Sequence, residues 1–510
     1  MDSKITKKIK TVNSLASIVE GLKKKGKKVI QCHGVFDLIH LGHIRHFNLA
    51  KKEGDILIVT ITKDKHVKRG PGRPIFNEHL RAETLASLAV TDYVCIIDSP
   101  TATECIKVLK PNFYAKGMDY KQKEKDITGK IYDEEEAVKS VGGQLIFTDD
   151  INFSSSQIIN NYMDAYPPKT LKYLKAFKKR YTTNLIVDQL HALKNLNVLV
   201  IGDAIIDQYH YCAPMGKSSK EHLVANRYIS EESFAGGSLA TANNVANLCG
   251  KVDLLTVLGR KNTQQDFIES HLSANVEPKF FYRSDTNTIV KRRFVSDVVN
   301  TKLFEICYMQ DTYVPKWEEE NILRHLQSVI KEYDLVVVSD YGHGLLTKNI
   351  IKYLCSKSKY LSLNVQTNSA NIGFNLVTKY PHANFICIDE MELRFATHDR
   401  SSSLKAHMRT IYDRMRCQHM ITTRGPFGSL VYSGQDGFHE TPALSYRVID
   451  AIGAGDAFFA FTSPCFAKGM EQEAVSFIGN VVGSLAVQIV CNRKPVQLVD
   501  LIKFITRLLK

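Results

Sequence analysis

The chain has 510 residues, more than one ordinary hydrophobic core supports, so two or more domains are expected. Hydrophobic residues make up 44% and charged residues 24%, as in globular proteins. No apolar run approaches the roughly eighteen residues of a membrane span, and no apolar stretch follows the N-terminal lysines as in a signal peptide. The eleven cysteines include no CxxC pair, which indicates free thiols in a reducing compartment. We therefore expect a cytoplasmic protein that does not associate with membranes.

The net charge of +14 raises the question of nucleic acid. Lysine runs such as Lys23–Lys25 and Lys178–Lys179 are not interleaved with aromatic residues, as an RNA-stacking surface would require. Solvated helix faces explain most of this charge, and polyphosphate substrates would explain some of the excess. We expect no nucleic-acid partner.

In chain order, residues 1–27 are basic and predict a helix. Residues 28–163 then alternate short apolar runs with helical periods. This pattern predicts a parallel sheet with helices on both faces. The expected strands are 28–34, 55–62, 93–98 and 112–117, and the expected helices between them include 42–53 and 77–90.

Residues 164–194 begin with a Pro-Pro break and continue as a polar, basic, helical pattern, which predicts a linker. A new strand at 196–203 starts a second α/β domain, expected over 195–510. The two domains do not repeat each other in sequence.

The first domain carries His40 and His43 on either side of Gly42, where a strand is expected to become a helix. A helix N-terminus at the carboxyl edge of a parallel sheet attracts anions. Both imidazoles can face one anion there, and Gly42 leaves room for a phosphate to approach the backbone. Histidines donating to a triphosphate would stabilise charge on the α-phosphate and on leaving pyrophosphate.

The motifs "GVFDLIHLGH", "AKKEGDILIVTITKD", "RGPGRPIFNEHLRAETL", "KPNFYAKGMDY" and "FSSSQII" follow in the order seen in cytidylyltransferase-like nucleotidyltransferases, which residues 28–160 resemble. The resemblance implies a Rossmann-like domain that joins a nucleoside triphosphate to a sugar or polyol phosphate with Mg²⁺ and releases pyrophosphate. It implies that His40 and His43 bind and polarise the triphosphate, and that Asp37 orders the turn. The other nucleotide-binding residues it implies are Gly34, Phe36, Gly42, Lys68 or Arg69, Arg81, Ser154, Ser155 and Ser156.

Because of two departures from that family pattern, the sequence does not decide whether the nucleoside triphosphate is ATP or CTP. The segment "TDDINF" lacks the arginine and glutamate that often precede the serine cluster. The adenylyl-heptose relatives carry KGGDY where this chain has Lys116–Tyr120, "KGMDY".

The second domain carries Gly453-Ala454-Gly455 between a strand-like segment and an apolar helix. Consecutive backbone N–H groups in such a turn form an anion hole, to which the helix dipole adds. Asp456 then stands on the first helical turn, facing the same phosphate. A carboxylate beside an anion site suits a base that takes a proton from a sugar hydroxyl, although a tight helix cap alone would give the same pattern.

The motifs "LVIGDAIIDQYHY", "FAGGSLATANNVANLCG", "VVVSDYGHGLL", "ITTRGPFGSLVY" and "DAIGAGDAF" follow in the order seen in ribokinase-like (PfkB) carbohydrate kinases, which residues 195–500 resemble. The resemblance implies an α/β domain with a small β lid, ATP as phosphoryl donor, and Asp456 as general base. It implies that Gly453, Ala454 and Gly455 hold the phosphoryl group. The sugar-binding residues it implies are Asp203, Asp207, Gly236, Gly237, Asn244 and Asp340, and the ATP-binding residues are Thr423, Arg424 and Gly425.

Three positions depart from the kinase pattern. Asp389 and Glu392 replace the family's Asn-x-x-Glu, whose glutamate organises magnesium, and carboxylate oxygens still suit Mg²⁺. Ala240 and Gln208 stand where heptose kinases have asparagine and arginine, within the implied sugar pocket. These two leave the sugar open.

The two halves together resemble the bifunctional enzymes of ADP-heptose synthesis, with the domain order reversed. This implies that heptose 7-phosphate is phosphorylated at C1 and that a nucleotide is transferred to a sugar 1-phosphate, supplying a surface glycan. A homodimer through the kinase domain is expected by analogy with kinases of this fold. Two alternatives stay open: a kinase half that only binds or regulates, and a basic nucleic-acid-binding protein on a nucleotidyltransferase sheet.

Overall fold

The computed structural model describes residues 3–67, 70–117, 130–148, 166–297, 301–310, 312–445 and 447–510. It divides into two compact units, residues 1–167 with 502–510 and residues 168–501. Both units are α/β, as predicted from the sequence. Within the described ranges, no helix combines the length and apolar character needed to cross a membrane.

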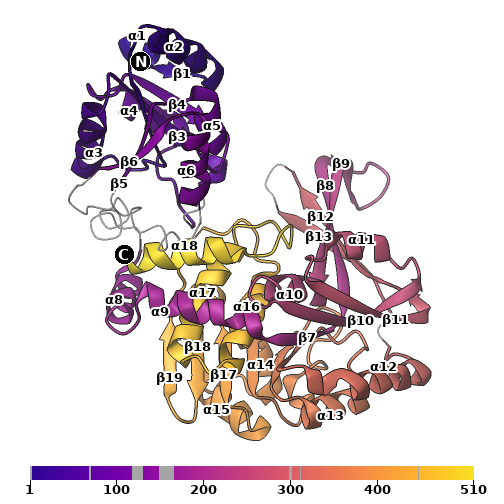
Figure 1. Ribbon diagram of the computed structural model, residues 1–510. Coiled ribbons are helices and arrows are strands. Elements are labelled where there is room, and N and C mark those ends of the chain that lie inside the picture. The colour runs from indigo at the N-terminus through magenta and orange to yellow at the C-terminus, as the bar shows by residue number, and fades with distance from the viewer. Residues whose placement is uncertain are drawn as a thin grey trace. The chain divides into compact units, whose positions relative to one another are not determined.

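The first unit, in indigo and purple in Figure 1, is built on a parallel sheet. The sheet has six strands in the order β1-β4-β3-β2-β5-β6. Strand β2 lies in the interior, with β3 on one side and β5 on the other. Strand order therefore reverses at β2, and the loop after β2 opens at the switch point where such sheets bind ligands. The strands are β1 (Ile9–Lys10), β2 (Val29–Gly34), β3 (Ile56–Thr62), β4 (Tyr93–Ile97), β5 (Phe113–Gly117) and β6 (Gln144–Thr148).

Helices cover both faces of this sheet because residues along each strand alternate sides. Ile30 and Cys32 of β2 pack with Phe47 of α3, whereas Val29 packs with Leu15 of α2. The helices of this unit are α1 (Ser3–Lys8), α2 (Val12–Lys24), α3 (Leu41–Lys52), α4 (Glu78–Ala86), α5 (Thr103–Leu109) and α6 (Lys130–Ser140), with a short 3₁₀ turn η1 (Asp64–His66).

The N-terminal segment differs from the single basic helix that was predicted. Ile9 and Lys10 form β1, which pairs in parallel with Val94 and Cys95 at the sheet edge. The Thr11 side chain then accepts from the backbone N–H of Ser14 and caps α2. Edge pairing and a cap break the helix into two.

The last residues of the chain belong to the first unit, although the second domain was predicted to extend to 510. They form the end of α18 (Leu498–Leu509), and Arg507 Nη1 donates to the carbonyl of Pro71 at 3.3 Å. Gly70 has φ +87°, and a Cβ added there would lie 2.7 Å from the ring of Phe504. Residues 502–510 thus pack on the loop after β3.

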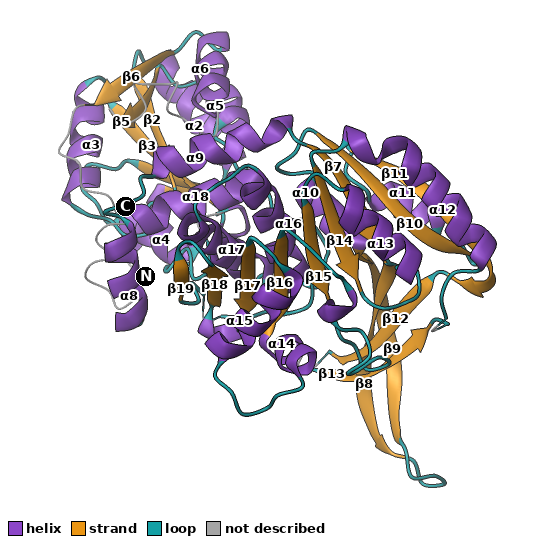
Figure 2. Cartoon of the chain, turned by 90° about the horizontal axis from the view of Figure 1, so that it is seen from below, coloured by secondary structure: helices purple, strands orange, loops and turns teal. Residues whose placement is uncertain are grey.

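The second unit is built on a nine-stranded sheet, ordered β11-β10-β7-β14-β15-β16-β17-β18-β19, in which only the pairs β17–β18 and β18–β19 are antiparallel (Figure 2). Its strands are β7 (Asn197–Gly202), β10 (Lys251–Lys261), β11 (Val276–Asn287), β14 (Leu335–Asp340), β15 (Leu361–Val365), β16 (Phe385–Asp389), β17 (His419–Thr423), β18 (Ser429–Ser433) and β19 (Gly437–Thr441).

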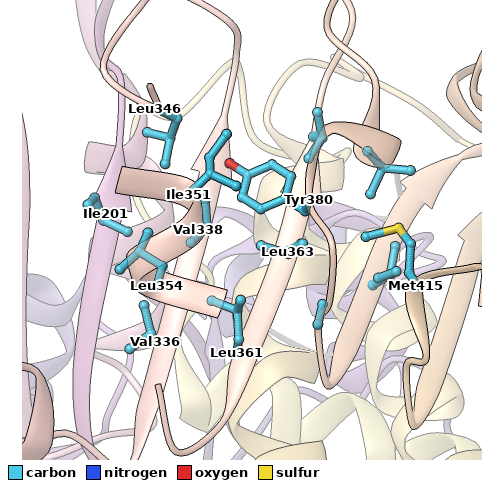
Figure 3. Close-up of a cluster of buried hydrophobic side chains, with 14 of the residues drawn as sticks. Ile201, Val336, Val338, Leu346, Ile351, Leu354, Leu361, Leu363, Tyr380 and Met415 are labelled. Carbon is cyan, nitrogen blue, oxygen red and sulfur yellow. The ribbon is translucent and has the colours of Figure 1, made fainter. Parts of the chain in front are cut away.

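Helices flank this sheet on both faces, and Figure 3 shows Ile351 and Leu354 of α13 packed over Val336 and Val338 of β14 and Leu361 of β15. These side chains are almost fully buried, which anchors the strand ends that carry the site. The helices are α8 (Pro168–Phe177), α9 (Thr183–His191), α10 (Ser238–Val245), α11 (Gln265–His271), α12 (Lys316–Val329), α13 (Lys348–Lys357), α14 (Glu390–Thr397), α15 (Leu404–Met415), α16 (Ala454–Ala467) and α17 (Gln472–Ala486).

A second, four-stranded sheet of order β13-β12-β8-β9 forms the β lid of this unit. Its long β8–β9 hairpin projects away from the nine-stranded sheet in Figure 2. The lid strands are β8 (Ala204–Lys217), β9 (Val224–Gly237), β12 (Ile289–Ser296) and β13 (Lys302–Tyr308).

The predicted linker is part of the second unit from Pro168 onward. The Phe177 ring stacks on Phe477 of α17 at 4.2 Å between centroids, and the Tyr181 hydroxyl donates to Glu471 at 2.5 Å. Helices α8 and α9 are amphipathic, and their buried faces pack on this unit.

Candidate active sites

The second unit contains a cavity of about 800 Å³ at the carboxyl end of its nine-stranded sheet. Its walls come from the lid, from the ends of β15, β16 and β17, and from the first turn of α16. Asp207, Gly237, Thr423, Gly425, Asp389, Glu392 and the turn Gly453–Asp456 are among the lining residues. Residues more than two hundred positions apart thus line one cavity.

Asp456 is buried on the first turn of α16, and its Oδ1 accepts two side-chain hydrogen bonds. The donors are the Tyr341 hydroxyl at 2.7 Å and Gln366 Nε2 at 2.5 Å. Burial raises the pKa of Asp456 to about 6, although these two hydrogen bonds oppose the shift. A carboxylate with a pKa near neutrality is suited to proton abstraction.

The Gly453 turn is fixed by its backbone. Gly453 has φ +82°, and a Cβ added there would lie 2.0 Å from Asn492 Oδ1. A Cβ on Gly455 would meet nothing within 4 Å, so this position opens onto the cavity that it lines. The Ala454 N–H donates to the carbonyl of Ala451 at 3.3 Å, and residues Gly453–Asp456 line the cavity at the N-terminus of α16, where an anion is favoured.

The lid contributes a row of charges to the same cavity. Arg293 of β12 forms an ion pair with Asp207 of β8 and a second one, at 2.7 Å, with Glu305 of β13. Lys291, two residues earlier on β12, also lines the cavity and is 8% exposed. The lid face over the cavity therefore alternates acidic and basic groups.

Asp389 and Glu392 form a capping box at the start of α14. Asp389 Oδ1 accepts from the Met391 N–H at 2.7 Å, and the Glu392 oxygens accept from the N–H groups of Asp389 and Thr367 at 2.8 and 3.0 Å. Burial raises the pKa of Glu392 to about 7. Both carboxylates line the cavity, and their oxygens are the type of ligand that would suit Mg²⁺ there. Across the described residues, no cluster of three or more metal-ligating side chains occurs.

In the first unit, His40 and His43 lie where β2 leads into α3. His40 is the N-cap, and its Nδ1 accepts from the Gly42 N–H at 3.2 Å. A neutral imidazole in that role carries its proton on Nε2. The two rings stack with centroids 3.9 Å apart, so both lie on one side of the turn.

Hydrogen bonds and ring packing fix the turn that precedes these histidines. Asp37 is buried and binds Arg73 at 2.9 Å and the N–H groups of Ile75 and Phe76 at 2.7 and 3.2 Å. Phe36 has φ +49°, and its ring edge packs on His43. A Cβ on Gly34 would lie 2.9 Å from that ring, so Gly34 is needed for packing.

The family described as pfkB family carbohydrate kinase matches residues 195–492, more than half of the chain. The chain belongs to this family. The cytidylyltransferase-like family matches residues 32–161, ahead of the pfkB unit, so the order of the two matches is the predicted one.

Relatives include the bifunctional protein HldE of Geobacter metallireducens, 37% identical over 162 residues, which covers 31% of this chain and 32% of that protein. HldE of Nitratiruptor is 44% identical over 118 residues, covering 23% of this chain and 26% of that protein. The matched segments span about a third of these relatives' length or less. Phosphofructokinase-2 from Escherichia coli, solved with substrates and products, is 12% identical and has a TM-score of 0.51, covering 62% of this chain and 100% of that one. That likeness shows the fold.

Several predicted residues of the pfkB unit do not line the cavity but form hydrogen bonds or ion pairs with other residues of the unit. Asp203 accepts from the N–H groups of Tyr341 and His343 at 3.1 and 3.3 Å. Asp340 binds Lys379 at 2.5 Å and the Tyr380 hydroxyl at 2.6 Å. None of Asp203, Asp340, Gly236, Asn244 and Arg424 is among the residues that line the cavity.

Each of the other three has a structural partner. A Cβ on Gly236 would lie 2.0 Å from Asp207 Oδ2, so the glycine makes room for that carboxylate. Asn244 Oδ1 accepts from the Val496 N–H at 3.0 Å, and Arg424 pairs with Glu440 at 3.1 Å. The departures Ala240 and Gln208 are also not among the residues that line this cavity.

Arg81 was expected to contact a phosphate, but its guanidinium is directed into the protein. It is 1% exposed and donates to the carbonyls of Phe76, Val35 and Thr62 at 3.0, 2.5 and 2.8 Å, and it pairs with Asp64 at 2.5 Å. Arg81 thus ties α4 to the ends of β2 and β3. The predicted residues Lys68, Arg69, Ser154, Ser155 and Ser156 lie outside the described residues.

Sequence reasoning missed the side chains that set the environment of Asp456. Tyr341 follows β14 inside the quoted "SDYGHG" motif, and Gln366 follows β15, so both lie at the carboxyl end of a strand. A search for polar residues directly after each apolar strand would have found them. Lys291, in the middle of the lid strand β12, has no such signal.

Proposed function

We propose that the protein is a bifunctional enzyme: a kinase that phosphorylates a sugar with ATP, and a nucleotidyltransferase that transfers a nucleotidyl group from ATP or CTP to a sugar 1-phosphate. The observation that carries the kinase half is the buried Asp456 carboxylate beside the open Gly453–Gly455 turn in one cavity. The stacked His40 and His43 at the switch point support the transferase half.

In the kinase reaction, Asp456 takes the proton of a sugar hydroxyl, and that oxygen forms a bond to the γ-phosphorus of ATP. The bond between the γ-phosphorus and the β–γ bridging oxygen breaks, and ADP leaves. The N–H groups of the Gly453–Gly455 turn hold the phosphoryl oxygens. Asp389 and Glu392 would hold Mg²⁺, which neutralises phosphate charge when it is bound.

In the transferase reaction, a phosphate oxygen of the sugar 1-phosphate attacks the α-phosphorus of the nucleoside triphosphate, and pyrophosphate leaves. His40 Nε2–H and the His43 ring would donate to the triphosphate as charge builds on the leaving group. Neither His40 nor His43 forms a covalent bond to the substrate in this step.

We propose heptose 7-phosphate, phosphorylated at C1, as the kinase substrate, and supply of a nucleotide-linked heptose for a surface glycan as the role. The HldE relatives of the chain support this choice.

A homodimer through the lid is supported by β13, where Leu303, Phe304 and Ile306 are 41–50% exposed. Light scattering on wild type and on Phe304→Asp tests the dimer, since the variant should run as a monomer.

The deciding experiment offers the purified protein heptose 7-phosphate and heptose 1-phosphate separately, with Mg²⁺ and either ATP or CTP. We expect Asp456→Asn to abolish only the 1,7-bisphosphate product and His43→Ala to abolish only the NDP-heptose product. Release of pyrophosphate with another polyol phosphate, but with neither heptose, would retain the folds and reject the heptose assignment.

The alternative of a kinase half that only binds a sugar phosphate predicts heptose 7-phosphate binding without ADP formation. The arrangement of Asp456, Tyr341 and Gln366 favours the active kinase, because a binding module has no use for a buried carboxylate beside an anion hole. The nucleic-acid alternative predicts salt-dependent binding to random DNA, which a fluorescence titration would detect.

A further inference from the structure

Lys291 is a buried cation in the pfkB cavity that the reaction described above does not use. It lies on the cavity face of the lid strand β12 and is 8% exposed. Its neighbour on that face, Arg293, is engaged by Asp207 and Glu305. No hydrogen bond or ion pair of the Lys291 ammonium occurs within the described part of the chain, so its donors are available to an anion bound in the cavity that it lines.

The surroundings of Lys291 place it beside the reacting groups. Its Nζ lies 6.0 Å from the ring centroid of Tyr341, the residue whose hydroxyl donates to Asp456. In the lid register Lys291 is directly opposite Asp207, and its charge lowers the pKa of both Asp207 and Asp456. The Gly453–Gly455 anion hole opens into the same cavity.

We propose that Lys291 binds the phosphoryl group while it passes from ATP to the sugar, opposite the N–H groups of the Gly453–Gly455 turn. This rests on the proposed kinase function. The turn and the ammonium then hold oxygens of the same group, while Asp456 takes the hydroxyl proton and ADP departs with the electron pair of the broken P–O bond. Lys291 exchanges no proton in this step, which therefore needs no further reactant.

The test compares Lys291→Met, which keeps the length of the side chain without its charge, with Lys291→Arg, which keeps the charge. The matched control is Arg292→Met on the opposite face of the same strand, where the side chain binds Gln208 and Tyr308 outside the cavity. Kinase assays should show that Lys291→Met lowers kcat by at least about 100-fold with KM for ATP nearly unchanged. Lys291→Arg should recover part of that loss, and Arg292→Met should resemble wild type.

A binding measurement separates this proposal from the identity of the sugar. Aluminium fluoride with ADP and Mg²⁺ mimics the phosphoryl group in transfer, and calorimetry can follow how much it tightens ADP binding. Fluoride should tighten ADP binding about 10-fold or more in wild type, Lys291→Arg and Arg292→Met, but not in Lys291→Met. Binding of the mimic by a wild type that phosphorylates no heptose would reject the substrate and keep the role of Lys291.

Three results would overturn the proposal. One is equal fluoride-dependent tightening in wild type and Lys291→Met. Another is a wild type whose ADP binding does not respond to fluoride. The third is a Lys291→Met enzyme with normal kcat but a raised KM for the phosphorylated sugar, since Lys291 would then hold the phosphate that the acceptor already carries. Thermal unfolding of both Lys291 variants shows that each comparison is made on folded protein.

Discussion

The Tyr341 hydroxyl donates to Oδ1 of Asp456 at 2.7 Å, and both groups are buried beside the cavity of the pfkB unit. Tyr341 follows β14 and Asp456 begins α16, so the contact joins the centre of the sheet to the helix that carries the proposed base. A hydrogen bond to a carboxylate favours its ionised form.

The first prediction concerns the pH dependence of kinase activity. A general base must be ionised, so kcat/KM should fall as the pH drops through about 6, the pKa to which burial raises Asp456. Tyr341→Phe removes a hydrogen bond that lowers this pKa, so the acid limb should move to higher pH. Rate profiles from about pH 5 to 9 check this. If the acid limb lies at the same pH in both proteins, Tyr341 does not influence the pKa of the catalytic base.

A second prediction compares two buried aspartates. Since the pKa of folded Asp456 lies above the ordinary 3.8, its contribution favours folding at low pH and is lost as the pH rises through about 6. That rise corresponds to about 3 kcal/mol at neutral pH. Asp456→Asn keeps the acceptor for Tyr341 and Gln366, so it should stabilise the unit by about 1–3 kcal/mol while abolishing kinase activity.

Asp450 is the matched control, because its pKa is lowered. Burial opposes ionisation there, but hydrogen bonds from Lys302, Tyr209 and Ile452 outweigh it. Its contribution is present above its unfolded pKa and is lost as the pH falls through its folded pKa. Asp450→Asn should destabilise by about 1–3 kcal/mol. Denaturant unfolding at neutral pH should give opposite signs for the two variants, and equal signs would refute the assignment.

A third prediction separates the two glycines of the anion-hole turn. Gly453→Ala forces a Cβ against Asn492 at φ +82°, so it should cost at least about 2 kcal/mol. Gly455→Ala meets nothing and sits in a helix, so stability should stay the same or rise by up to about 1 kcal/mol. Its methyl group enters the cavity, however, and should lower kcat strongly. Thermal unfolding and steady-state kinetics on both variants check the pair.

A fourth prediction concerns Arg81 of the first unit. Arg81→Met leaves Asp64 and three carbonyls without their buried partner, which should destabilise this unit by about 3–5 kcal/mol. His43→Ala should abolish nucleotidyl transfer with a smaller loss of stability. Thermal unfolding followed with transferase kinetics tests both. If Arg81→Met is as stable as wild type and only KM for the triphosphate rises, Arg81 is a phosphate ligand after all.

A fifth prediction tests whether Asp389 both caps α14 and binds the metal ion. Asn caps helices about as well as Asp, so Asp389→Asn should retain stability, whereas Asp389→Ala should cost about 1 kcal/mol. Both variants lose a carboxylate at the proposed magnesium position. The Mg²⁺ concentration for half-maximal kinase rate should therefore rise in both, and an unchanged requirement would exclude Asp389 from metal binding.

The local features of the fold could be predicted from the sequence because they depend on local patterns. The strand before His40 and the helix after Gly453 each follow from neighbouring residues. The strand-like segment before Gly453 was misread: the described residues 447–453 are irregular. Asp450 explains this, since its carboxylate binds Tyr209, Lys302 and two backbone N–H groups and holds the segment as a loop.

The places of Lys291 and Arg81 in the fold depend on contacts between distant residues. Lys291 reaches the cavity only because β12 pairs with β8, more than eighty residues earlier. The motif around Arg81 predicts a phosphate ligand. The fold shows instead that Arg81 donates to backbone carbonyls at the ends of β2 and β3. Sequence spacing carries no information about which distant strand ends a sheet brings together.

The packing of residues 502–510 on the loop after β3 has a consequence for biosynthesis. N-terminal domains usually fold while the rest of the chain is still being translated, at about 5–20 residues per second. Here the first unit waits for its last helical turns until the 334 residues of the second unit, from 168 to 501, have been made. At those rates the delay is roughly 17–70 s. During that interval the Gly70 surface, which Phe504 later covers, lacks its cover, and the loss of residues 502–510 alone would leave the nucleotidyltransferase-like unit incomplete.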